Sequence, residues 1–121
     1  MIELLVVIAI IGILAIIILV ALSSARQKAR QASGEATLSA IVPAATMCID
    51  DNSNLNAPGD GNLVCVGSTS SWPPGSGAAD WTVGWAAIAA TDIDVSDGTF
   101  SYNAVGPLNT FTCTESGCIR T

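Results

Sequence analysis

Four cysteines are the residues of this 121-residue chain best suited to covalent or metal chemistry, and all of them follow residue 47. An even number of cysteines in a short, loop-rich segment favours disulfides and an oxidising compartment. Four cysteines allow three connectivities, and pairing neighbours in sequence is the simplest of them, which gives Cys48–Cys65 and Cys113–Cys118. A zinc site of four thiolates is the alternative, but only Cys113 and Cys118 have the close spacing typical of such sites.

Two acid-rich stretches have the composition of cation-binding loops, residues 50–61 (DDNSNLNAPGDG) and residues 92–98 (DIDVSDG). An EF-hand loop needs glycine at its sixth position and glutamate at its twelfth. Counted from Asp92, the sixth residue is Asp97 and the twelfth is Asn103, so the pattern fails. We therefore interpret both stretches as solvated turns and expect no cofactor.

Glu3 is the third chemical feature, because it stands at the start of an apolar run. From Leu4 to Leu22 no side chain is charged or polar. Nineteen residues at about 1.5 Å each form roughly 28 Å of helix, enough to cross a bilayer core. A carboxylate buried beside such a segment costs several kcal/mol unless a cation meets it. The partner of Glu3 therefore bears directly on function.

Charge is divided unevenly along the chain. Residues 1–49 hold Glu3 and Glu35 against three cations, whereas residues 50–121 hold eight acids and one cation, Arg120. The acidic second part should repel nucleic acid, so we expect no such partner. The sequence contains no histidine, the commonest proton-transfer group and metal ligand, and we expect no enzyme.

The apolar run has no basic start and no small-residue cleavage site, so we expect it to stay with the mature protein. Arg26, Lys28 and Arg30 follow it, and the positive-inside rule would keep that end in the cytoplasm. The cysteines favour the opposite side of the membrane. A basic leader before Met1 would set the orientation and remove this conflict.

The element that carries Glu3 is predicted to be one long helix over residues 2–49, about 70 Å in length and kinked near Pro43. Gly34 is a weak point in it. Small residues recur at steps of three and four and predict a stripe on one helix face, which permits close approach of the head's sheet or of adjacent subunits. The stripe comprises Ala25, Ala29, Ala32, Ala36, Ala40, Pro43 and Met47.

Residues 50–121 have the pattern of a small head of short antiparallel strands and loops. LVCVG (63–67) is a candidate strand, residues 80–92 are ambiguous between strand and helix, GTFSYNAV (98–105) alternates as a strand, and TFTC and CIRT flank TESG as a terminal hairpin. We expect the aromatic residues to pack in the core or against subunits: Trp72, Trp81, Trp85, Phe100, Tyr102 and Phe111. The predicted class is α+β, with segments 1–22 (membrane or filament-core helix), 23–49 (amphipathic continuation) and 50–121 (disulfide-bearing head).

Residues 2–15, IELLVVIAIIGILA, resemble the N-terminal helix signature of type IV pilins and type II secretion pseudopilins. In that family a prepilin peptidase removes a leader, and the mature chain usually begins Phe-Thr ahead of the residue that matches Met1. We expect these two residues to precede Met1 here. Glu3 matches the family's glutamate, Gly12 matches its helix glycine, and Val20 stands where the family often has proline.

The resemblance implies a ladle-shaped subunit that polymerises into an extracellular filament for adhesion, motility or cell–cell contact. It implies that Glu3 pairs with the free N-terminal amine of a neighbouring subunit and sets the register, that the helix loosens near Gly12, and that the N-terminus is methylated. It also implies that a disulfide joins Cys113 and Cys118 near the C-terminus.

The implied partners are further copies in a helical homopolymer, an inner-membrane assembly machinery, and the inner membrane before assembly, with the head on the extracytoplasmic side. A pseudopilin that drives protein export is the alternative function. Pseudopilins carry calcium loops that are not EF-hands, so a calcium site is the alternative to a chain without cofactor. A plain single-pass anchor, with Glu3 among the lipid headgroups, is the alternative to assembly.

Overall fold

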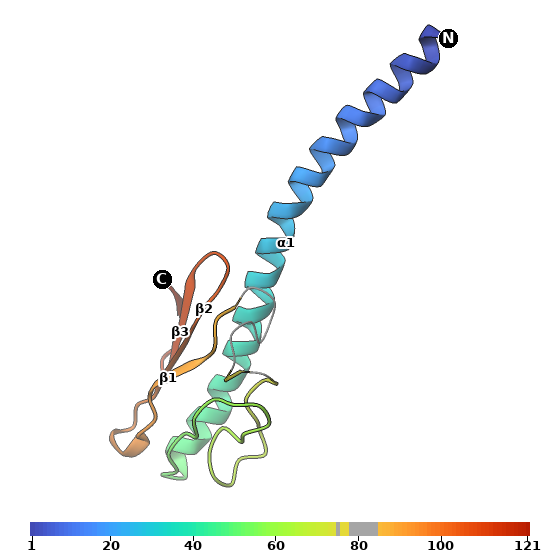
Figure 1. Ribbon diagram of the computed structural model, residues 1–121. Helices are drawn as coiled ribbons and strands as arrows, with labels where there is room; N and C mark the ends of the chain where they lie inside the picture. Colours follow the sequence, from blue (N-terminus) through green and yellow to red (C-terminus); the bar gives the residue numbers. More distant parts are fainter. Residues whose placement is uncertain (75, 78–84) are drawn as a thin grey trace.

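The fold combines one long helix with one antiparallel sheet, as Figure 1 shows for a computed structural model that describes residues 1–74, 76–77 and 85–121. Helix α1 covers Ile2–Asp50. The head contains strands β1 (Ala89–Asp92), β2 (Ser101–Val105), β3 (Thr110–Thr114) and β4 (Gly117–Arg120), with a 3-10 turn, η1 (Val95–Asp97), between the first two. The strands form one sheet in the order β1-β2-β3-β4, with every neighbouring pair antiparallel. The predicted α+β class is confirmed.

Helix α1 continues without interruption through its whole length and bends gently rather than sharply (Figure 1). Its 49 residues correspond to roughly 73 Å. Pro43 lies inside the helix and cannot donate a hydrogen bond to the carbonyl of Ser39. Both residues are exposed, so water can satisfy that carbonyl.

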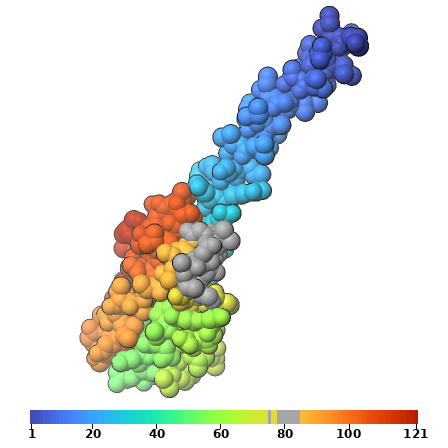
Figure 2. Space-filling model, viewed as in Figure 1, coloured from blue at the N-terminus to red at the C-terminus, as the bar shows by residue number. Residues whose placement is uncertain are grey.

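The two parts of α1 differ in what surrounds them. No residue from Met1 to Arg30 is buried, and the first buried position is Gln31. From there to its end the helix packs against the head, while its first part projects away from it (Figures 1 and 2). The border between projecting helix and head-packed helix therefore lies about eight residues beyond Leu22, where the apolar run ends.

The sheet follows the predicted alternation closely. In β2 Tyr102 and Ala104 are buried, and in β3 Phe111 and Cys113 are buried opposite them in register. Strands β3 and β4 form the predicted terminal hairpin. The predicted strand at 63–67 is wrong: that segment makes only isolated bridges, of which one joins Cys65 to Leu55.

The core lies between the second half of α1 and the sheet. Leu38, Ile41, Ala45 and Cys48 enter it from the helix. Trp72, Trp85, Phe100, Tyr102 and Phe111 are all buried there, as predicted, whereas Trp81 lies outside the described residues. The ring of Tyr102 packs edge-on against Trp72, with centroids 5.4 Å apart, and stacks on Phe100. The hydroxyl of Tyr102 donates a 2.8 Å hydrogen bond to the carbonyl of Leu38, which fixes the sheet on the helix.

Candidate assembly surface

The projecting part of α1 exposes an apolar surface over residues 2–22, in which Glu3 is the one charged residue, and this surface is here called the apolar shaft. Leu4 is 71% exposed and Ile16 is 65% exposed, and the large apolar residues between them are exposed to a similar degree. The mean hydropathy of an 18-residue window in α1 is 3.6, and the helix is long and apolar enough to cross a membrane. Burying each Leu or Ile would contribute roughly 1.5–3 kcal/mol. The shaft is therefore compatible with burial in a membrane.

Glu3 lies in the first turn of α1, where its negative charge suits the positive end of the helix dipole. It is exposed, and its carboxylate has no hydrogen bond or ion pair among the described residues. Gly12 lies further along the same surface with open space around it, inside an uninterrupted helix. Among the residues that the structure describes, nothing covers the apolar shaft or pairs with the carboxylate at its start.

The stripe of small residues is exposed and does not form the helix face buried against the head, which corrects one of the two expectations for it. Ala29, Ala32, Ala36 and Ala40 are exposed, as is Met47. The helix face that packs on the head carries instead Gln31, Gly34, Leu38, Ile41, Ala44, Ala45 and Cys48. The face that packs on the head therefore mixes large and small residues, and the four alanines of the stripe lie on the exposed face.

A polar contact joins the first head-packed turn of α1 to the C-terminal strand. The carboxylate of Glu35 accepts hydrogen bonds from Nε and Nη2 of Arg120 at 2.8 and 2.6 Å, and from Nε2 of Gln31 at 2.7 Å. Gln31 is only 4% exposed, and its Oε1 accepts a bond from the backbone of Leu108. The hydrogen bond from Arg120, and to a smaller extent that from Gln31, lowers the pKa of Glu35. This cluster holds the β2–β3 loop and β4 against the helix.

Gly34 is required where Trp85 packs on α1. A Cβ atom at this position would overlap the indole ring, and one on Gly106 would come close to the same ring from the β2–β3 loop. The indole Nε1 also donates a 3.0 Å hydrogen bond to the carbonyl of Arg30. The expectation that Gly34 only weakens the helix was therefore incomplete, because the missing side chain makes room for Trp85.

Two disulfides close the head in the pairing expected from proximity. Cys48–Cys65 fastens the end of α1 to the loop that follows it. Cys113–Cys118 joins directly opposite residues of β3 and β4. No free cysteine is found among the described residues.

The acid-rich segment at 92–98 forms hydrogen-bonded turns. Asp94 caps η1 by accepting from the amide of Ser96, and this bond lowers its pKa. Asp97 accepts from the hydroxyl and the amide of Thr99, which lowers its pKa as well. In the described parts of the chain no three metal-binding side chains come together.

Sequence reasoning missed the residues that fasten the head to the helix. Gln31 and Glu35 stand four apart, which is a readable helix pair, but nothing in the sequence connects them with Arg120 or Leu108. Glutamine is mostly exposed in folded proteins, so hydrophobic periodicity would not select Gln31 as a buried position.

Comparisons with known proteins gave no match to a family model, to a curated protein or to a solved structure.

Proposed function

We propose that this chain is a filament subunit of the type IV pilin kind, held in the inner membrane by its apolar shaft before it polymerises outside the cell. The observation that carries the proposal is the exposed shaft, which begins with the string IELLVVIAIIGILA and emerges from a head whose own core is already filled. A helix that is apolar on every side leaves the bilayer only if equivalent helices replace the lipid. A bundle of shafts supplies that environment.

Glu3 gives the bundle its register in this proposal. A carboxylate inside an apolar bundle is tolerated only next to a cation. The N-terminal amine of a neighbouring copy is the partner implied by the family resemblance. Because the pair forms at only one relative position of the two helices, each added copy is held at a fixed axial step.

Substitution of Glu3 tests this role. Glu3→Gln keeps the shape of the side chain and removes its charge, so we expect a folded, membrane-inserted chain that forms no filaments. Glu3 lies outside the head, hence the tryptophan fluorescence of the head should not change. Filaments of normal length and helical rise from the Glu3→Gln chain would contradict the register role.

The length of the assembly separates the two candidate functions. A major pilin should yield long filaments that can be sheared from the cell surface. A pseudopilin of an export machine should yield only a short periplasmic assembly. The exposed shaft supports both equally, and this measurement decides between them.

Assembly should also stretch α1 just beyond Gly12. Glycine weakens a helix by about 1 kcal/mol relative to alanine, so this is where extension costs least. Val20 retains the amide that a proline would lack, and the loosened stretch should therefore be shorter than in a proline-bearing pilin. Unbroken helical bonds from Leu4 to Leu22 in a filament would contradict this prediction.

A further inference from the structure

Three cations lie within five residues of one another where α1 leaves the apolar shaft, and they are here called the basic collar: Arg26 and Arg30 on one side of the helix and Lys28 on the other. All three are exposed. Within the described residues the one salt bridge joins Arg120 to Glu35, so the collar side chains have no acidic partner there. Since the sequence holds only four cations, the collar contains every positive side chain that remains.

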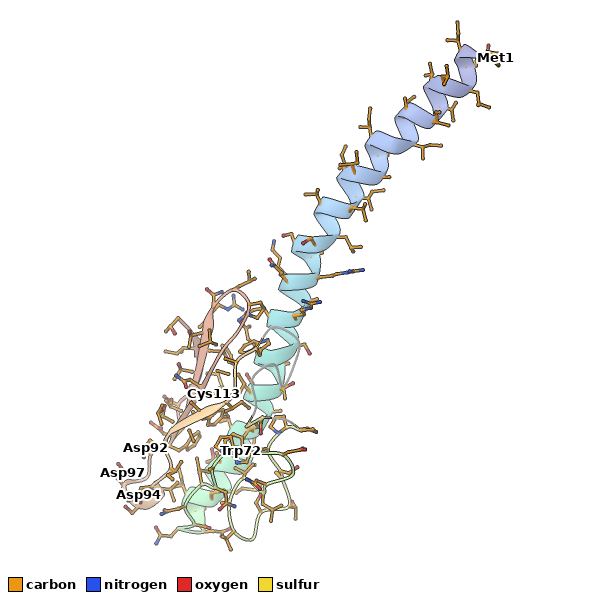
Figure 3. The ribbon with its side chains drawn as sticks, in the orientation of Figure 1. Met1, Trp72, Asp92, Asp94, Asp97 and Cys113 are labelled. Carbon is orange, nitrogen blue, oxygen red and sulfur yellow. A yellow bond between two sulfur atoms is a disulfide. The ribbon has the colours of Figure 1, made fainter. Side chains whose placement is uncertain are left out.

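The part of the head farthest from Met1 is acidic. Two acids end α1 and three more surround η1, and together they form the acidic end: Asp50, Asp51, Asp92, Asp94 and Asp97. Figure 3 places the labelled acids of this group at the end of the head farthest from Met1. The loop that follows Asp51 is joined to the segment around η1 by a 3.0 Å hydrogen bond, which the amide of Leu55 donates to the carbonyl of Ile93.

The electrostatics of this end are unfavourable in a single chain. The last turn of α1 carries no basic residue, so the two terminal acids add to the negative end of the helix dipole. Hydrogen bonds lower the pKa of Asp94 and of Asp97, which keeps both charged. The basic collar of the same chain cannot neutralise these acids, because Lys28 and Asp51 are 23 residues apart along α1. That is about 35 Å, several times the Debye length of roughly 8 Å at physiological salt.

We propose that the basic collar of one copy binds the acidic end of a second, parallel copy displaced by about 35 Å along the helix axis. The inference rests on the proposed function, since it requires copies aligned in one assembly. Charge complementarity selects the partner, because the acidic end meets a matching cluster only on another copy of this chain. An antiparallel pair would also match the charges, but it would leave the two apolar shafts at opposite ends without cover.

The same displacement accounts for two other exposed features. A shift of 23 residues brings the apolar shaft of one copy, residues 2–22, beside residues 25–45 of the other. That is where Ala29, Ala32, Ala36 and Ala40 lie exposed, and small side chains allow close approach of a second helix. One displacement therefore covers the shaft, uses the small-residue stripe and pairs both charged clusters.

Lys28 makes the contact directly measurable, since it is the sole lysine in the sequence. A carbodiimide joins an amine to a carboxylate only when the two touch, with no spacer. In sheared filaments we expect an amide between Lys28 and an aspartate of the acidic end, identified by mass spectrometry after digestion. Such a link must join two chains, because within one chain the groups are about 35 Å apart. Lys28→Arg, which keeps the charge and removes the amine, should form filaments and lose the link.

Charge-reversed variants test the same contact in a second experiment. Lys28→Glu with Arg30→Glu, or Asp50→Lys with Asp51→Lys, should each reduce the filament yield severalfold, and the four changes together should restore it. All four side chains are exposed, so the head should keep its fold and its tryptophan fluorescence. Wild-type filaments in which Lys28 links only to other carboxylates, or reversed chains that assemble normally, would overturn this inference and leave the proposed function intact. Failure of the wild-type chain to form filaments would overturn both.

Discussion

Adding one methyl group to the helix face that packs on the head should destabilise this protein. The substitution is Gly34→Ala, at a position inside α1. In an exposed helix interior this change stabilises by about 1 kcal/mol, because alanine is the better helix former. Here the new Cβ would overlap the indole ring of Trp85, which the close approach of Gly106 prevents from moving away.

The magnitude follows from the opposing terms. Overpacking a filled core costs typically about 1–3 kcal/mol. Displacing the ring also breaks the bond from its Nε1 to the carbonyl of Arg30, worth about 0.5–1.5 kcal/mol. After subtraction of the gain in helix propensity, the free energy of unfolding should fall by roughly 1–3 kcal/mol.

Urea unfolding of the full chain in detergent, followed by tryptophan fluorescence, measures this change. Ser33→Ala is the matched control, since Ser33 is the exposed neighbour and its replacement should shift the stability by less than about 0.5 kcal/mol. In a Trp85→Leu background the ring is gone, so Gly34→Ala should become neutral or stabilising. A stabilising effect of Gly34→Ala in the wild-type background would refute the packing of Trp85 on α1.

Three further predictions concern the head. Burial raises the pKa of Tyr102, the only tyrosine in the sequence, so an absorbance titration should show its hydroxyl ionising well above pH 10. The free energy of unfolding should therefore fall as the pH rises past about 10, the pKa of tyrosine in the unfolded chain, and Tyr102→Phe should lack this effect. The pKa of Glu35 is lowered in the folded chain, so the ionised carboxylate should contribute fully to stability above about pH 4.3, the pKa of glutamate in the unfolded chain. This contribution should be lost as the pH falls through the pKa of Glu35 in the folded chain, and acid unfolding of Arg120→Met should not show the loss. Replacing Cys65 by serine opens a disulfide loop of 17 residues and should lower the free energy of unfolding by about 3 kcal/mol, as measured in urea. Replacing Cys118 by serine opens a loop of 5 residues and should lower it by about 2 kcal/mol. Equal losses would contradict the loop-entropy account.

The elements of this fold were largely readable from the sequence, because they depend on local pattern. The apolar run and the helical spacing after it predicted α1 to within one residue of its end. Alternation around Tyr102 predicted β2, and the short segment between Cys113 and Cys118 predicted the terminal hairpin. Segment 63–67 has strand-like composition but no neighbouring strand to pair with, so it remained a loop with isolated bridges.

The packing of the helix on the head was not readable, because it depends on partners far away in sequence. The regular spacing of Ala32, Ala36 and Ala40 resembles a packing face, yet the head covers the face with Gln31 and Gly34. Gln31 is buried because the β2–β3 loop and Arg120 pack over it, and Gly34 is buried because Trp85 packs on it. Residues in the apolar shaft have no such partners in the described part of the chain, so the sequence pattern alone describes them well.

The measurement that tests the central claim most directly is an electron cryo-microscopy reconstruction of the assembly at side-chain resolution. The account predicts a helical polymer with the apolar shafts bundled at its centre, heads outside, and Glu3 within hydrogen-bond distance of a cation on another copy. A chain that remains a monomer in the membrane, or a polymer in which Glu3 faces solvent and the shafts lie apart, would contradict it.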